Sequence, residues 1–166
     1  VGRRPQVPIG RLLGLRSSLV LHEGVNASTL WVLTPPVMIP TNAISNTALY
    51  TLLMRYNGWR MRKAVRGAMQ ILQIKSPVLI NAFSPAWGIS LLNRLGERRI
   101  IYYCYDDIAN CPWVRNHGPR LERQFIPTVD ALVVSSEGLL REKSAFGKPT
   151  FVVKNGVNPL FFQPIK

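Results

Sequence analysis

The sequence predicts an α/β fold, in which a Rossmann-like, mostly parallel sheet is flanked by helices. From residue 78 onward, short apolar runs of strand length alternate repeatedly with segments of helical pattern, which is typical of right-handed βαβ units. The run at residues 99–105 is apolar at nearly every position, which favours a strand covered on both faces. The 166 residues and the hydrophobic fraction of 47% suit one domain with a proper core. We therefore expect a doubly wound sheet.

The N-terminal half is predicted to contain a hairpin and a long helix. Apolar runs at residues 19–22 and 29–33 flank a turn-rich segment and indicate two paired strands. A proline-rich loop follows, and then a helical pattern at residues 45–73 with a break expected at Asn57-Gly58. The buried stripe of this helix is expected at Met61, Val65, Ala68 and Leu72.

The C-terminal half is predicted to form the parallel sheet. Its strands are expected at residues 78–83, 99–105, 131–135 and 150–154. Helices are expected at residues 87–95, 119–129 and 137–146, with Gly96 capping the first of them. Strands that follow one another in this way place their carboxyl ends along one edge, where ligands bind in open α/β sheets.

The chain is strongly basic. Lys and Arg number 21 against 8 for Asp and Glu, and the formal net charge is +13. Such a surface attracts nucleic acid, anionic lipid headgroups or phosphate-bearing substrates. The sequence contains no zinc-finger, helix-turn-helix or RNP-type motif, which makes nucleic acid the less favoured partner. It also contains neither a GxGxxG nor a P-loop motif, so dinucleotide and P-loop chemistry are not indicated.

The two cysteines, Cys104 and Cys111, are predicted to be reduced structural thiols. Their spacing matches no standard zinc site, and no metal site is expected. No stretch approaches the roughly 18 apolar residues of a membrane-spanning helix. The basic start of the chain is interrupted by Arg11 and Arg16, which argues against a signal peptide. These features predict a cytoplasmic protein.

Acidic side chains follow the apolar strand at residues 99–105. Asp106 and Asp107 would lie at the carboxyl edge of the sheet, where a carboxylate can act as a general base or hold sugar hydroxyls. The simpler interpretation is that one of the two caps the next turn. His117, just downstream, is a further substrate-binding candidate, and the alternative is a plain loop histidine.

The order of motifs across residues 100–162 resembles the N-terminal domain of bacterial GT-B glycosyltransferases. That family has a strand ending in an Asp pair, a helix with Glu, an Asp-Ala-hydrophobic strand ending in Ser, and an Asn-Gly-Val-Asp motif with Phe four residues later. The matching positions are Asp106-Asp107, Glu122, Asp130, Ser135-Ser136, Asn155-Gly156-Val157 and Phe162. Asn158 stands where the family has Asp, which puts the role of that side chain in doubt.

The resemblance implies one half of a GT-B fold. Residues 1–154 would be the Rossmann-like acceptor-side domain, lacking its first βαβ unit, and residues 155–166 would begin the interdomain connection. This half would bind no cofactor, because the nucleotide sugar that serves as donor would sit in a C-terminal domain missing from this chain. The implied function is transfer to a sugar or lipid-linked acceptor in cell-surface polysaccharide or glycolipid synthesis. The implied substrate contacts include Ser136 and Asn155.

The long helix carries a predicted membrane-surface face. Arg55, Trp59, Arg62 and Arg66 share the side opposite the apolar stripe, and they combine cations for anionic lipid with an aromatic ring for the interface. Such a face would place the protein peripherally at the inner side of the cell membrane. A solvated basic helix is the simpler interpretation. The alternative function is a non-catalytic basic α/β module that binds nucleic acid or an anionic membrane.

Overall fold

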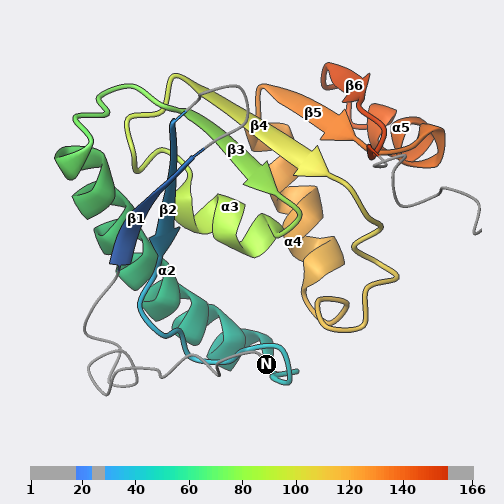
Figure 1. Cartoon of the computed structure of the whole chain (residues 1–166). Helices are drawn as coiled ribbons and strands as arrows, with labels where there is room; N and C mark the ends of the chain where they lie inside the picture. The colour runs from blue at the N-terminus through green and yellow to red at the C-terminus, as the bar shows by residue number, and fades with distance from the viewer. Residues whose placement is uncertain (1–17, 24–28, 157–166) are drawn as a thin grey trace, which may run out of the picture.

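The computed structural model describes residues 18–23 and 29–156 and contains a four-stranded parallel sheet with helices packed against it (Figure 1). Every neighbouring pair in this sheet is parallel. The strands lie in the order β3 (Val78–Ala82), β4 (Arg99–Cys104), β5 (Ala131–Val134) and β6 (Thr150–Val152). The predicted α/β class, the parallel pairing and the interior position of the strand at residues 99–104 are confirmed.

The helices that connect these strands all pack on one face of the sheet. They are α3 (Pro85–Leu91), α4 (Gly118–Phe125), which runs on into the short 3-10 helix η2 (Ile126–Thr128), and α5 (Glu137–Ser144). The strand order advances in one direction, so right-handed crossovers put every connection on the same side. The expectation of a doubly wound sheet is therefore wrong for the described residues, because their strand order never reverses.

The core lies between this face and the helices, and the opposite face of the sheet stays open. Tyr102 and Leu132 are fully buried beneath Phe125 of α4. On the other face Ile80 and Phe151 remain 60% and 58% exposed. The strand at residues 99–105 is buried on the first face but only half-buried on the second, where Ile101 and Tyr103 lie, so the prediction that both its faces are covered is confirmed only in part. A run of apolar residues permits burial on both faces but does not supply the element that would cover the second one.

The long helix α2 (Thr47–Ile71) forms a further layer beside α3, away from the sheet (Figure 1). Asn46 caps it by accepting a hydrogen bond from the Leu49 backbone N–H. The predicted break at Asn57-Gly58 is wrong. The Asn57 amide group instead binds both the N–H and the carbonyl of Ile39, at 3.0 and 2.9 Å, and so ties the preceding loop to an unbroken helix.

The buried side of α2 is rotated from the predicted stripe. The predicted stripe (Met61, Val65, Ala68 and Leu72) is only half-buried. The buried positions are Tyr50, Asn57, Gly58 and Ala64. Gly58 permits the close approach to α3, because a Cβ there would lie 2.9 Å from the Ser90 Oγ. The buried side of α2 is therefore the side that contacts α3 and the loop at Ile39. It is not the side with the most apolar residues.

The N-terminal hairpin is confirmed as a separate antiparallel sheet. It consists of β1 (Ser18–Glu23) and β2 (Thr29–Thr34), with Leu21 opposite Trp31. The expected interdomain connection at residues 155–166 is described only at Asn155 and Gly156; the remainder, including the positions of Asn158 and Phe162, lies outside the described residues. Gly96 has a positive φ of 69° but lies beyond Leu92, the residue that caps α3, so the predicted capping role is wrong.

Candidate functional site

A pocket of about 230 Å³ opens beside the carboxyl end of β3. Its walls come from the loop before α2, the first half of α2, the turn between β3 and α3, and the segment that enters α4. Ligands bind at this edge of open α/β sheets. The aromatic and polar lining side chains are Tyr50, Asn57, Trp87, Trp113, Asn116 and His117. Rings combined with a few hydrogen-bonding groups are typical of small-molecule sites.

His117 is the one sequence-predicted site residue that lines this pocket. It is buried, its ring stacks on Tyr50 at 3.8 Å between centroids, and its Nε2 lies 2.7 Å from the Ile44 carbonyl oxygen. A carbonyl oxygen can only accept, so Nε2 carries a proton in this arrangement. His117 therefore ties the segment before α4 to the loop before α2, and it holds two walls of the pocket together.

A cation lies next to this aromatic pair. Burial raises the pKa of the Tyr50 hydroxyl, and the positive charge of Arg120 opposes that shift. The Arg120 Nη2 atom is itself buried and has no hydrogen-bond partner in the part of the chain that the structure describes. A buried guanidinium nitrogen without a partner is a group that an incoming acceptor could satisfy. No sequence motif marked Tyr50 or Trp113, because each lines the pocket only together with distant parts of the chain.

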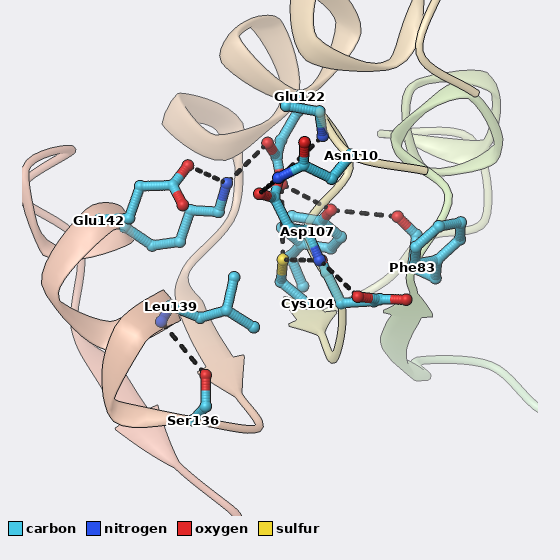
Figure 2. A network of polar contacts seen from close by, with 12 residues as sticks. Phe83, Cys104, Asp107, Asn110, Glu122, Ser136, Leu139 and Glu142 are labelled. Atoms are coloured by element: carbon cyan, nitrogen blue, oxygen red, sulfur yellow. Dashed lines mark hydrogen bonds and ion pairs between the residues drawn. The ribbon is translucent and has the colours of Figure 1, made fainter. Parts of the chain in front are cut away.

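The Asp pair belongs to the loop after β4 and lies outside the pocket lining. Asp107 accepts from the Ala109 N–H at 2.8 Å and from the Asn110 amide at 2.7 Å, as Figure 2 shows for Asn110. Both of its carboxylate oxygens are thus used to shape a turn. Asp106 is exposed; one oxygen accepts from the Asp107 N–H at 2.9 Å and the other lies 3.6 Å from the Cys111 Sγ. Of the pair, Asp106 is the better candidate for chemistry.

Ser136 and Asn155 lie at the carboxyl ends of β5 and β6 and do not line the pocket. The Ser136 hydroxyl accepts from the Leu139 N–H at 3.3 Å and caps α5 (Figure 2). The Asn155 side-chain oxygen accepts from the Tyr103 hydroxyl at 3.3 Å. The structure therefore brings the predicted catalytic and substrate-binding residues to one edge of the sheet but places only His117 in the pocket.

A polar network is buried beneath the sheet, where Glu122 of α4 meets Lys143 of α5 (Figure 2). The Glu122 Oε2 and Lys143 Nζ atoms are 2.8 Å apart, and the two side chains are only 8% and 2% exposed. The other Glu122 oxygen lies 2.9 Å from the Tyr102 hydroxyl and 3.5 Å from the Cys104 Sγ. These contacts lock α4 and α5 to β4, and we interpret the network as structural.

The two thiols do not have the electrostatics of nucleophiles. Burial, together with the charge of Glu122, raises the pKa of Cys104 to about 12. Burial and the nearby Asp106 also raise the pKa of Cys111. A catalytic cysteine needs a lowered pKa, so both side chains stay protonated near neutral pH, in agreement with the structural role expected from the sequence.

The same groups predict that the protein loses stability at alkaline pH. Burial raises the pKa of Tyr102 above its ordinary value, as it does for Cys104. Burial acts to lower the pKa of Lys143, but its hydrogen bonds to Glu122 and Glu142 outweigh this and raise it. Below about pH 8.5 both the folded and the unfolded chain hold these protons, so these groups do not change the free energy of unfolding with pH. Above it the unfolded chain releases protons first, and stability falls by about 1.4 kcal/mol per pH unit for each group in its range.

Urea unfolding between neutral pH and about pH 10.5 tests this expectation. The free energy of unfolding should begin to fall at the pH where thiols of the unfolded chain ionise, about pH 8.5. In a Cys104→Ala/Cys111→Ala variant it should begin to fall later, near the ordinary pKa of tyrosine. A free energy of unfolding that stays level up to pH 10 in the native protein would contradict it.

The four residues of the predicted membrane face differ in their contacts. Arg55 and Trp59 are exposed. Arg62 instead donates to the Ser90 carbonyl at 2.8 Å, and Arg66 donates to the Arg94 carbonyl at 2.9 and 2.6 Å. Both guanidinium groups therefore hold α2 against α3 and the turn after it. Lipid binding by the predicted face stays a prediction.

Within residues 18–23 and 29–156, no helix has the length and apolar character needed to cross a membrane. The same residues contain no cluster of three or more His, Cys, Asp or Glu side chains suited to a metal ion. Comparison of the chain with family models, curated proteins and solved structures found no match.

Proposed function

We propose that this chain is the acceptor-binding half of a nucleotide-sugar-dependent glycosyltransferase and that the pocket beside β3 holds the acceptor. The observation that carries the proposal is the lining of that pocket. Tryptophan and tyrosine rings there stand beside side-chain amides. A sugar ring packs its apolar face on an aromatic ring and hydrogen-bonds its hydroxyls to amides. Trp113, which is 56% exposed, is the platform on which the acceptor ring stacks.

Asp106 is the base that the proposal assigns to the acceptor hydroxyl. Phe83 links its loop to the pocket, because the Phe83 ring lies 5.2 Å from the Tyr105 ring and 6.2 Å from the Trp113 ring. Tyr105 directly precedes Asp106 in the chain. In this proposal an acceptor stacked on Trp113 presents its hydroxyl to the exposed carboxylate. The carboxylate takes the proton as the new glycosidic bond forms and the bond between the donor sugar and its nucleoside diphosphate breaks. Asp107 serves only to shape the loop.

The donor nucleotide sugar binds to a separate C-terminal domain that acts with this one, and this half binds no cofactor. The protein works in the cytoplasm on a sugar or lipid-linked acceptor for cell-surface polysaccharide or glycolipid. The competing function is a non-catalytic basic module. One observation favours it, the uncovered surface of α2 that carries Arg55, Arg60 and Lys63.

The first test is acceptor binding. Saturation-transfer NMR with a panel of cell-surface oligosaccharides should detect binding to the native chain. Trp113→Ala should weaken it about tenfold, as expected for loss of a stacked ring. Trp31→Ala removes a tryptophan from the hairpin, outside the pocket, and should leave binding unchanged. Equal effects of the two variants would overturn the assignment of the pocket.

The second test concerns the donor nucleotide sugar, which the proposal assigns to another domain. Calorimetry with uridine and guanosine diphosphate sugars should show no tight binding, and the chain alone should transfer no sugar. Sub-micromolar nucleotide affinity would show that the halves have been assigned the wrong way round.

A further inference from the structure

A row of large apolar side chains runs along the outer side of α2 and is left uncovered. Leu49, Leu52, Tyr56 and Trp59 follow one another at spacings of three, four and three residues, which places them on one face of a helix. All four are exposed, from 45% for Tyr56 to 63% for Leu52. We call these four residues the outer row. It faces away from the buried side of the helix, where Asn57 and Ala64 lie.

The outer row is flanked by cations alone. The sequence of α2, from Thr47 to Ile71, contains no Asp or Glu. With Arg62 and Arg66 bound to carbonyl groups near α3, the cations left at the outer row are Arg55, Arg60 and Lys63. The Arg60 guanidinium carbon lies 5.8 Å from the centre of the Tyr56 ring, and the Lys63 Nζ lies 5.7 Å from that of Trp59. These cation–π contacts hold both charges over the aromatic rings.

We propose that the outer row docks on the surface of a membrane rich in anionic lipid. Leucine side chains with tyrosine and tryptophan suit the boundary between headgroups and acyl chains, and the flanking cations suit the lipid phosphates. Nucleic acid offers phosphate but no apolar layer for Leu49 and Leu52. An acidic protein is the remaining competitor. The inference goes beyond the proposed function, since it holds whether or not the pocket beside β3 binds a sugar.

The geometry also predicts how the protein lies on the membrane. The outer row is on one side of α2 and α3 is on another, so docking leaves the contact between α2 and α3 undisturbed. The pocket is lined partly by Tyr50 and Asn57 of the same helix. Docking through α2 therefore holds the pocket close to the lipid surface.

Co-sedimentation with vesicles tests the proposal. The native chain should bind vesicles of phosphatidylserine and phosphatidylcholine in equal parts and should ignore pure phosphatidylcholine. Arg55→Gln/Arg60→Gln/Lys63→Gln should weaken binding about a hundredfold, since each cation near such a surface contributes about fivefold. The matched control Arg98→Gln/Arg123→Gln/Arg141→Gln removes the same charge from other exposed positions and should bind within a few fold of the native chain.

The apolar part of the surface needs its own variant. Leu52→Ser/Trp59→Ser should also lose vesicle binding, because it removes the side chains that enter the interface while keeping every cation. The native tryptophan emission should shift to the blue on vesicles, and Trp59→Phe should remove most of that shift. Equal losses of vesicle binding in the two triple variants, or native-like binding by Leu52→Ser/Trp59→Ser, would overturn the proposal. So would tighter binding of the native chain to duplex DNA or polyglutamate than to the anionic vesicles.

Discussion

Glu122→Ala is expected to destabilise the folded chain by about 3 kcal/mol or more, a large part of the stability of a domain of this size. The substitution removes the carboxylate that lies 2.8 Å from the buried Lys143 ammonium. It also removes one of the two acceptors of the Tyr102 hydroxyl, which keeps the Phe83 carbonyl oxygen at 3.0 Å. Lys143 would keep only Glu142, whose side chain is 54% exposed. Breaking a buried ion pair from one side costs more than the pair contributes, because the partner's charge stays buried.

Urea unfolding at neutral pH, followed by circular dichroism, measures this effect. Glu142→Ala is the matched control, since it removes the solvent-exposed partner of the same lysine and should cost less than about 1 kcal/mol. A double variant, Glu122→Leu/Lys143→Met, replaces both charges by apolar groups and should recover much of the loss. If Glu122→Ala and Glu142→Ala cost the same, the buried network does not have the role assigned to it.

Gly88→Ala is expected to cost about 3 kcal/mol by overpacking the core. Gly88 lies in α3 against the ring of Phe125, and an added Cβ would sit 2.6 Å from the Phe125 Cε1 and nearer still to Cζ. Phe125 cannot move easily, because it is fully buried and packs edge-on against Tyr102. The clash should push α3 from α4 and reshape the pocket wall that follows Ser84. Thermal and urea unfolding would both report the loss.

Gly67→Ala is the control for this experiment. Gly67 also lies in a helix, α2, but a Cβ added there would meet no atom within 4 Å. Replacing glycine by alanine in an exposed helix should stabilise the chain by about 1 kcal/mol. The two glycine variants should thus move stability in opposite directions. A Gly88→Ala protein as stable as the native one would mean that α3 and α4 are not packed as described.

Local patterns in the sequence were sufficient to predict the strands of the sheet. The strands at residues 78–83, 99–105 and 131–135 were predicted within a residue or two, because each is an apolar run between turn residues. Parallel pairing followed from the alternation with helices. Asn57 shows where local reasoning failed: a polar residue beside glycine indicates a break, but its amide satisfies the Ile39 backbone groups.

The candidate site was predicted only in part. Placing Asp106, Ser136 and Asn155 at one edge of the sheet needed only the direction of the strands, which the pattern supplies. The pocket needed contacts between segments far apart in the chain, since Tyr50, Trp87 and His117 meet there. The roles of Asp107 and Ser136 in a turn and a helix cap were likewise visible only from their hydrogen bonds.

The sequence by itself determined the class of fold, the strands of the sheet and the basic character of the surface, because composition and periodicity are properties of short segments. Tertiary structure alone decided which faces are covered. A helical pattern shows that α2 has distinct faces, but contacts with α3 and the turn after it engage Arg62 and Arg66 and leave Leu52, Tyr56 and Trp59 on the outside. The one-directional strand order likewise put all the connecting helices beneath one face of the sheet. Whether a face of a helix or sheet is buried depends on which other element packs against it, and a local sequence pattern does not specify that element.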